Sequence, residues 1–206
     1  MKDRVHVAPL GEISGLVIRR GIPHTAVAPT GKVPVYAIRA LREGLDPIGY
    51  VDLPTPRFGE EYLTRPGDIL VSLDNPGPKN VLLVDENMPQ CAVRQQIIVI
   101  RIEDRSMFDP SFLFGWVCGP GFQGDLTRYS SGQAMPRVRL DDVLRIPIPI
   151  PPLEEQRQLG MRLHQLESAA DIHLRVANTI ARLRQLQLSE MVATYAGDAM
   201  VGVQDE

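Results

Sequence analysis

Short apolar runs bounded by glycine, proline or asparagine follow one another through the first 149 residues of the chain. Several of them are rich in β-branched residues and have the length of a strand, so they predict a β-rich region. The predicted strands are residues 33–41, 68–73, 80–85 and 95–102. Residues 75–80 predict a hairpin-type loop between two of these strands, and residues 65–68 predict a turn that begins one.

One apolar stretch, residues 109–119, has helical spacing instead. Asp109 can cap a helix, and Pro110 suits its first turn. The apolar side chains that follow recur at helical intervals: Phe112, Leu113, Trp116 and Val117. This pattern predicts a short buried helix, and the polar, glycine-containing residues 125–138 after it predict a loop.

The last quarter of the chain has the pattern of one long helix. After Pro152 there is no proline, and Gly160 is the only glycine before the Ala-Gly-Asp sequence at residues 196–198. Apolar residues recur there every three or four positions, which predicts an amphipathic helix of about 40 residues. The predicted apolar stripe includes Leu159, Leu163, Leu166, Ala170, Val176, Ile180 and Leu183. A domain of about 150 residues cannot bury so long a stripe, so a second long helix is expected to cover it.

Isoleucine and proline alternate directly before this helix, in residues 146–152. A central β-strand does not tolerate repeated prolines, because proline lacks the N–H donor and fixes φ. We therefore interpret the segment as a stiff extended connector and not as a strand. Its isoleucines are expected to anchor the connector to the preceding domain. The helix is expected to begin at once at Pro152, with Glu154 and Glu155 at its positive end.

Composition and charge narrow the classes of function. The chain has 206 residues, 44% of them hydrophobic, and a net charge of −3. Lysine and arginine balance aspartate and glutamate over residues 1–149, so the net charge lies in the remainder. A neutral domain binds phosphate weakly by itself, and a DNA-binding role would require partners that add affinity. No apolar stretch approaches the about 20 residues of a membrane span, and two cysteines indicate reduced thiols, so a cytoplasmic protein without membrane contact is expected.

The sequence contains no recognisable catalytic or metal-binding motif. The four histidines are scattered, and paired acidic residues are adjacent, so that they face different directions. The glycine-containing stretches lack the strand–turn–helix context of a nucleotide site, and no P-loop occurs. We therefore expect no catalytic residue, no metal and no cofactor in this chain.

Taken in order, four segments resemble the target recognition domain and conserved helix of type I restriction–modification specificity subunits. They are the Gly-Asp-Ile-Leu of residues 67–70, the Asp-Pro-Ser-Phe-Leu of residues 109–113, the glycine-containing loop 131–136 and the Ile/Pro-rich residues 146–156 that open the long helix. The first and last segments of the chain are also similar to that family. No single motif is decisive, but the ordered set spans nearly the whole chain.

The resemblance implies an α+β fold. A mixed, β-rich globular target recognition domain would occupy residues 1–150, one long C-terminal α-helix for antiparallel helix pairing residues 151–197, and a tail residues 198–206. A full subunit of this family has two recognition domains and two long helices, so the chain looks like a half-subunit. A second copy would supply the missing helix in a homodimer, which would read a two-part palindromic site in double-stranded DNA.

The resemblance also implies partners. A DNA methyltransferase (modification) subunit would dock on the helices, and a restriction/motor subunit would be added for cleavage. S-adenosylmethionine and ATP would be carried by these partners and not by this chain, which is expected to be non-catalytic. Two alternatives stay open: a helix-mediated interaction module of another defence complex without useful DNA affinity, and the recognition part of a fused methyltransferase.

Candidate base-reading residues lie in the polar loops beside the predicted strands, because amide and guanidinium groups can pair with base edges in two places at once. They are Asn75, Lys79, Arg94, Gln95, Gln96, Arg128, Ser130, Ser131, Gln133 and Arg137. For each of them the alternative is a solvated loop group or a phosphate contact without sequence specificity. The resemblance transfers no base-contacting residue, since these loops vary most within the family.

Overall fold

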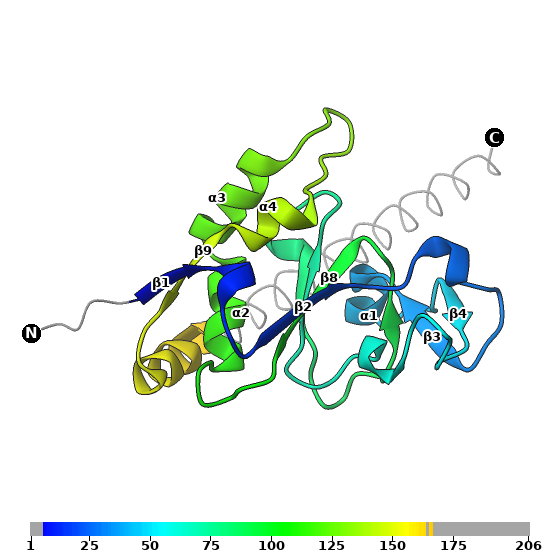
Figure 1. Cartoon of the computed structure of the whole chain (residues 1–206), viewed down its shortest axis with the longest axis horizontal. Helices are drawn as coiled ribbons and strands as arrows, with labels where there is room; N and C mark the ends of the chain where they lie inside the picture. Colours follow the sequence, from blue (N-terminus) through cyan, green and yellow to red (C-terminus); the bar gives the residue numbers. More distant parts are fainter. Residues whose placement is uncertain (1–5, 164, 167–206) are drawn as a thin grey trace, which may run out of the picture. The chain divides into compact units, whose positions relative to one another are not determined.

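A computed structural model of the chain describes residues 6–163, 165 and 166. Internal contacts divide the chain into residues 1–161 and 162–206. Except for residues 162, 163, 165 and 166, the described residues belong to the first unit, which contains strands in three sheets together with four short α-helices and the start of another helix (Figure 1). Within the described residues, no helix has both the length and the apolar character that crossing a bilayer requires.

The central sheet has four antiparallel strands. They are β2 (Leu16–Arg20), β8 (Ile97–Ile102), β5 (Ile69–Ser72) and β6 (Val81–Leu83), in this spatial order. Residues pair in a register that sets Leu70 opposite both Leu82 and Val99. Three of these strands were predicted from their β-branched runs, and the predicted loop 75–80 joins two of them.

Each face of the central sheet packs on a different layer, because successive residues of a strand point to opposite faces. One face packs against helix α2 (Pro110–Cys118), in a cluster that includes Ile69, Ile98, Leu113 and Val117. The other face packs against helix α1 (Ile38–Glu43) and strand β7 (Ala92–Val93), in a cluster that includes Leu70, Val99, Leu41 and Val93. The core thus has two layers with the sheet between them.

A smaller sheet contains β4 (Gly49–Val51), β3 (Val33–Tyr36) and β7 in that order. The strand predicted for residues 33–41 was wrong in its second half, because the chain leaves β3 and forms α1. Ile38 and Leu41 are buried and lie three residues apart, which is helical spacing. Gly44, with a φ of 64°, then ends the helix in the left-handed conformation.

Three short helices lie between β8 and the Ile/Pro segment. Helix α2 confirms the prediction, and the side chain of Asp109 accepts a hydrogen bond from the amide of Phe112 at 3.0 Å. The loop predicted for residues 125–138 was wrong at its start, because helix α3 (Pro120–Tyr129) continues through it. Phe122 and Leu126 bury one face of α3, although its two glycines obscure this pattern in the sequence. The short helix α4 (Leu140–Leu144) was not predicted.

The interpretation of the Ile/Pro segment as a connector and not a strand was wrong. Strand β9 (Pro147–Ile150) pairs antiparallel with β1 (His6–Pro9) in a sheet of two strands. The Leu10 amide donates to the Ile146 carbonyl at 2.9 Å, and alternation along the ladder makes Ala8 and Ile148 the next bonded pair. The prolines of β9 therefore occupy positions where an N–H would point away from β1. Ile146 and Ile148 are fully buried, which confirms them as anchors.

Single turns of 3-10 helix connect several of these elements: η1 (Leu10–Glu12), η2 (His24–Ala26), η3 (Glu60–Tyr62) and η4 (Pro78–Asn80). After β9 the chain becomes helical again from residue 153, and residues 153–163 belong to this helix.

Candidate nucleic-acid interface

Three polar segments meet at one end of the central sheet. They are the loop 73–80 between β5 and β6, the turn 94–97 before β8 and the loop 130–137 after α3. The amide of Leu73 donates to the Gln96 carbonyl at 2.7 Å, and the amide of Asn75 donates to the Pro136 carbonyl at 2.6 Å. These backbone bonds hold the three segments together, so their side chains are presented by a fixed frame.

The joined segments and the start of α1 surround a hollow of about 270 Å³. Its lining includes three of the residues predicted from the sequence, namely Asn75, Arg94 and Gln96. Residues from α1 and the neighbouring loops complete it, including Arg39, Asp74, Asn80 and Met135. The structure therefore brings together candidates that lie about 20 positions apart in the sequence.

The loop that carries Asn75 is held by its own hydrogen bonds. Asn75 has a φ of 49°, in the left-handed region that asparagine tolerates better than most residues. Its carbonyl accepts a hydrogen bond from Nδ2 of Asn80 at 2.7 Å, and the amide of Asn80 donates to the Gly77 carbonyl at 2.8 Å. The exposed side chain of Asn75 thus projects from a short, closed loop.

Arg94 and Gln96 form a pair at the edge of the hollow. Nε of Arg94 donates to Oε1 of Gln96 at 2.9 Å, across a turn closed by the Ile97 amide and the Arg94 carbonyl. Gln96 is bonded to Nε of Arg94. The two terminal nitrogens of Arg94, which can form a bidentate pair with a base edge, are therefore not held by Gln96. Strand β8 begins only at Ile97, and Gln95 therefore lies in the turn, half-buried.

Arg137 fastens two of the loops to each other. Its Nε and Nη2 contact the carboxylate of Asp74 at 2.6 and 3.2 Å, and this hydrogen bonding raises the pKa of the guanidinium. Its backbone pairs with that of Ser131 through two hydrogen bonds of 2.9 Å. Arg137 is thus a residue that positions the loops, in addition to carrying a charge.

Positive groups gather around this end of the sheet although the first 149 residues are neutral overall. Arg42 of α1 donates to the Lys79 carbonyl, and at 2.7 Å to the Val81 carbonyl, which holds the β5–β6 loop against the helix. The cations here are Arg39, Arg42, Lys79, Arg94 and Arg137, set against the carboxylates of Glu43 and Asp74. Sequence reasoning missed Arg39 and Arg42, because it assigned their segment to a strand.

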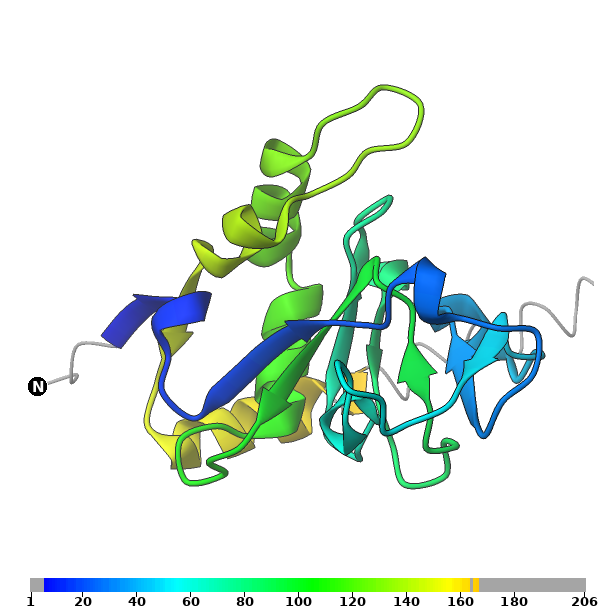
Figure 2. The same ribbon diagram turned by 45° about the vertical axis from the view of Figure 1, so that its right-hand side comes forward.

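The remaining candidates lie on α3 or on the loop after it (Figure 2). Arg128 is on the helix itself and pairs with Asp125 at 2.9 Å, while the hydroxyl of Ser130 donates to the Thr127 carbonyl at 2.7 Å. Ser131 and Gln133 are exposed on the loop 130–137. None of these four residues lines the hollow.

Comparison with known proteins assigns the chain to a family. Residues 3–182 match the family described as type I restriction modification DNA specificity domain. The chain belongs to this family. The resemblance inferred from the ordered motifs is thereby confirmed.

Curated relatives of this specificity domain have matching names. The EcoDI specificity subunit of Escherichia coli is 33% identical over 94 residues, which are 45% of this chain and 21% of the relative. The MjaVIII specificity subunit of Methanocaldococcus jannaschii is 25% identical over 127 residues, which are 61% of this chain and 30% of the relative. Both are named as specificity subunits of type I restriction enzymes.

Solved structures share the fold. A chain from a structure of the type I R-M system aligns with a TM-score of 0.62 and 22% identity, over 90% of this chain and 44% of that chain. The HsdS subunit of Thermoanaerobacter tengcongensis aligns with a TM-score of 0.54 and 21% identity, over 82% of this chain and 39% of that one. The specificity domain thus spans less than half the length of the relatives it matches.

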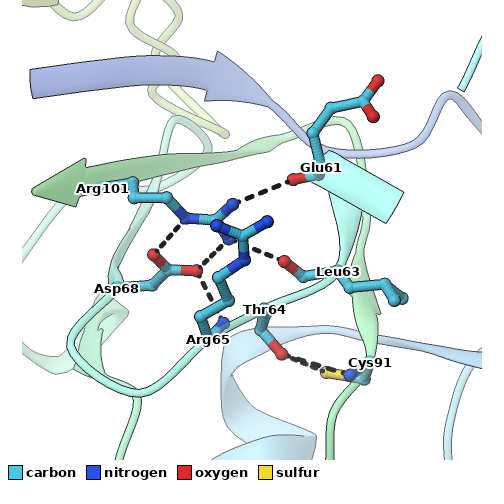
Figure 3. Close-up of polar contacts among 7 residues, drawn as sticks. All are labelled: Glu61, Leu63, Thr64, Arg65, Asp68, Cys91 and Arg101. Carbon is cyan, nitrogen blue, oxygen red and sulfur yellow. Dashed lines mark hydrogen bonds and ion pairs between the residues drawn. The ribbon is translucent and has the colours of Figure 1, made fainter. Parts of the chain in front are cut away.

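At the opposite end of β8, the specificity domain contains a buried ion pair that sequence reasoning did not single out (Figure 3). Nε and Nη2 of Arg101 contact the Asp68 carboxylate at 2.8 and 2.6 Å, and both side chains are nearly fully buried. Arg101 also donates to the carbonyls of Leu63 at 2.7 Å and Glu61 at 3.3 Å. The hydrogen bond to Asp68 raises the pKa of Arg101. The pair ties the segment of η3 to the central sheet.

Two other groups accompany this ion pair. The guanidinium of Arg19 lies 5.0 Å from the ring centre of Tyr62, and burial followed by the charge of Arg101 lowers the pKa of Arg19. The thiol of Cys91 lies 3.5 Å from the hydroxyl of Thr64, and burial raises the pKa of this thiol. In the part of the chain that the structure describes, no three His, Cys, Asp or Glu side chains gather as metal ligands would.

The predicted apolar stripe is described only at its beginning. Leu159 is 42% exposed, and Leu163 and Leu166 are also within the described residues. The other members of the stripe, Ala170, Val176, Ile180 and Leu183, lie outside them.

Proposed function

We propose that this specificity domain recognises a DNA sequence through the surface made by residues 73–80, 94–97 and 130–137. One observation carries the proposal: three loops joined by backbone hydrogen bonds place Asn75, Arg94 and Gln96 around one hollow that Arg39 also lines. Amide and guanidinium groups read base edges, and cations bind the phosphates on either side. Membership of the DNA specificity family supports the same role.

Individual roles follow from the contacts. Arg94 and Gln96 orient each other and are assigned to base reading, together with the exposed Asn75. Lys79 and Arg39 are assigned to phosphates, because both are exposed, Arg39 in the lining of the hollow and Lys79 on the loop 73–80. The remaining candidates do not line the hollow and are assigned to the DNA backbone: Gln95, Arg128, Ser130, Ser131 and Gln133.

The assembly is proposed from the family and the sequence pattern. The long helix, proposed to run from residue 153 to residue 197, would pair antiparallel with that of a second copy, and the homodimer would read a two-part palindromic site. The helices would dock a methyltransferase subunit carrying S-adenosylmethionine, with an ATP-dependent restriction subunit as a further partner. The chain itself would be non-catalytic and would act in the cytoplasm.

Binding measurements test the recognition surface. The chain, alone and in complex with a type I methyltransferase subunit, is used to select duplexes from a random library, and affinities are measured by fluorescence anisotropy. Arg94→Ala is expected to weaken binding to the selected sequence by about 1–3 kcal/mol and to relax the preference at one base pair. Lys79→Ala is expected to weaken binding to all sequences and to lower the salt slope by about 1.

A matched control is Arg145→Ala, which removes an exposed arginine paired with Asp142 away from the hollow. It is expected to bind like the wild type. Unchanged sequence preference in Arg94→Ala would contradict the assigned surface. An absence of DNA binding with and without the methyltransferase subunit would contradict the function, and would favour the helix-mediated interaction module instead.

A further inference from the structure

Gln156 is fully buried in the first turn of the helix that follows β9. Its Oε1 accepts a hydrogen bond from the Asp109 amide at 3.0 Å, and its Nε2 donates to the carbonyls of Met107 at 2.8 Å and Pro151 at 2.9 Å. Both Nε2 protons are therefore used, within one buried group. The carboxamide joins the new helix to the segment before α2 and to the end of the Ile/Pro strand.

Gly160 lies four residues further on, on the same face of the helix. A Cβ atom at this position would stand 2.6 Å from Oδ1 of Asp109 and 2.9 Å from the amide nitrogen of Phe112. The helix therefore rests directly against the first turn of α2, with no space for a methyl group. Glycine costs about 1 kcal/mol relative to alanine inside a helix, and this close approach explains its presence.

The contact is connected to the recognition surface through α2. Asp109 caps α2 with its side chain while its amide binds Gln156. Leu113 and Val117 of α2 are fully buried in the core cluster that also holds Ile98 of β8. The turn 94–97 leads directly into β8, so the start of the helix and the proposed base-reading residues are fixed to the same sheet.

We propose that Gln156 and Gly160 are positioning residues that fix the direction in which the long helix leaves the recognition domain. In the proposed dimer, that direction sets the distance between the two half-sites. This inference rests on the proposed function, because a fixed direction matters only where two recognition surfaces must be held at a defined spacing. A hydrogen-bonded amide suits the task better than apolar packing, because its bonds specify an orientation.

The test uses variants that change the contact between the helix and the start of α2 without leaving a cavity. Gln156→Met keeps the size of the side chain and removes its three hydrogen bonds. Gly160→Ala pushes the helix away from α2. Gln158→Met is the matched control, since Gln158 is exposed on the same helix and contacts only Glu154, at 3.3 Å, among the described side-chain bonds.

The first readout is binding to duplexes in which two selected half-sites are separated by different gaps, in complex with the methyltransferase subunit. Wild type and Gln158→Met are expected to prefer one gap. Gln156→Met and Gly160→Ala are expected to lose about tenfold of the preference for this gap over its neighbours, while affinity for a single half-site changes less than about twofold. An unchanged gap preference, or an equal loss at every gap and at the single half-site, would overturn the inference.

The second readout does not depend on DNA. Spin labels at the exposed positions Arg139 and Met161, in a background lacking the two cysteines, give the distance between the domain and the helix by double electron–electron resonance. Gln156→Met is expected to broaden a narrow wild-type distribution, and Gln158→Met to leave it unchanged. An unchanged distribution in Gln156→Met would overturn the inference even if DNA is bound. Failure of the wild type to bind DNA would overturn the proposed function instead.

Discussion

At the scale of single residues, the buried ion pair between Arg101 and Asp68 holds polar groups of this domain in place. Arg101 and Asp68 carry opposite charges where water is excluded, and the guanidinium reaches two further carbonyls. Transfer of either charge from water costs several kcal/mol, which the partner offsets only while both are present. A buried pair of this kind is therefore expected to be sensitive to the loss of one member.

Arg101→Leu is expected to lower the free energy of unfolding by about 3–5 kcal/mol, because the Asp68 carboxylate would stay buried without its partner. Urea denaturation followed by tryptophan fluorescence measures the change. Arg145→Leu serves as the control, since its pair with Asp142 has a 3.5 Å contact and an arginine side chain that is 75% exposed. The control should cost less than about 1 kcal/mol. Similar losses of unfolding free energy in both variants would show that the buried pair contributes no more to stability than the exposed pair.

The sequence predicted part of the candidate site at this scale. Asn75, Arg94 and Gln96 were named as candidates because they are polar and lie near the ends of predicted strands, and the structure places all three around one hollow. Arg39 and Arg42 were not, since their helix was assigned to a strand. Gln156 was noted as part of a motif, but not as a buried residue. A glutamine between charged residues in a first helical turn looks solvent-exposed until the segment that it binds is known.

At the scale of elements, β-branched runs predicted strands well, while helices with weak periodicity were missed. β5, β6 and β8 have few residues that favour any other structure. Helix α3 carries Gly121 and Gly124 in its first two turns, so its pattern was hidden. Strand β9 was missed for a different reason, because proline was taken to exclude a strand. In a sheet of two strands, every second residue of a strand points its N–H away from the other strand, so a proline at that position removes no hydrogen bond of the sheet.

The register between β1 and β9 predicts different outcomes of proline substitution at two neighbouring residues of β1. Ala8 occupies the hydrogen-bonded position opposite Ile148, whereas Val7 lies opposite Pro149. Ala8→Pro is expected to cost about 2 kcal/mol or more in unfolding free energy, because it removes a donor from the ladder. Val7→Pro is expected to cost less than about 1 kcal/mol. Urea denaturation checks both, and equal costs would contradict the register-based account.

At the scale of the whole molecule, the domain has a cationic end but no net positive charge over residues 1–149. Such a charge distribution can orient the domain on a DNA duplex, but charge alone gives the domain little affinity for DNA. The matched relatives are more than twice as long as their aligned part, as their coverage of 21% and 30% shows. In the proposed dimer, a second recognition surface held at a fixed distance would add affinity for DNA.

The predicted apolar stripe provides the test of that arrangement. If the long helix pairs with a second copy, size exclusion with light scattering should give about twice the chain mass of 22.9 kDa. Leu163→Asp combined with Ile180→Asp would bury charges in an apolar seam, and monomers are expected. Ile180 lies outside the described residues, so its place in the stripe rests on the sequence pattern alone.

The matched control places the same two charges on the polar side of the predicted helix, as Gln158→Asp with Gln165→Asp. Both glutamines are exposed, and the net charge changes by the same amount, so repulsion between the copies is comparable. This variant is expected to keep the dimer mass. A wild-type mass near 22.9 kDa at micromolar concentration would contradict the homodimer. A monomeric control variant would show that charge repulsion, and not loss of the apolar seam, separates the copies.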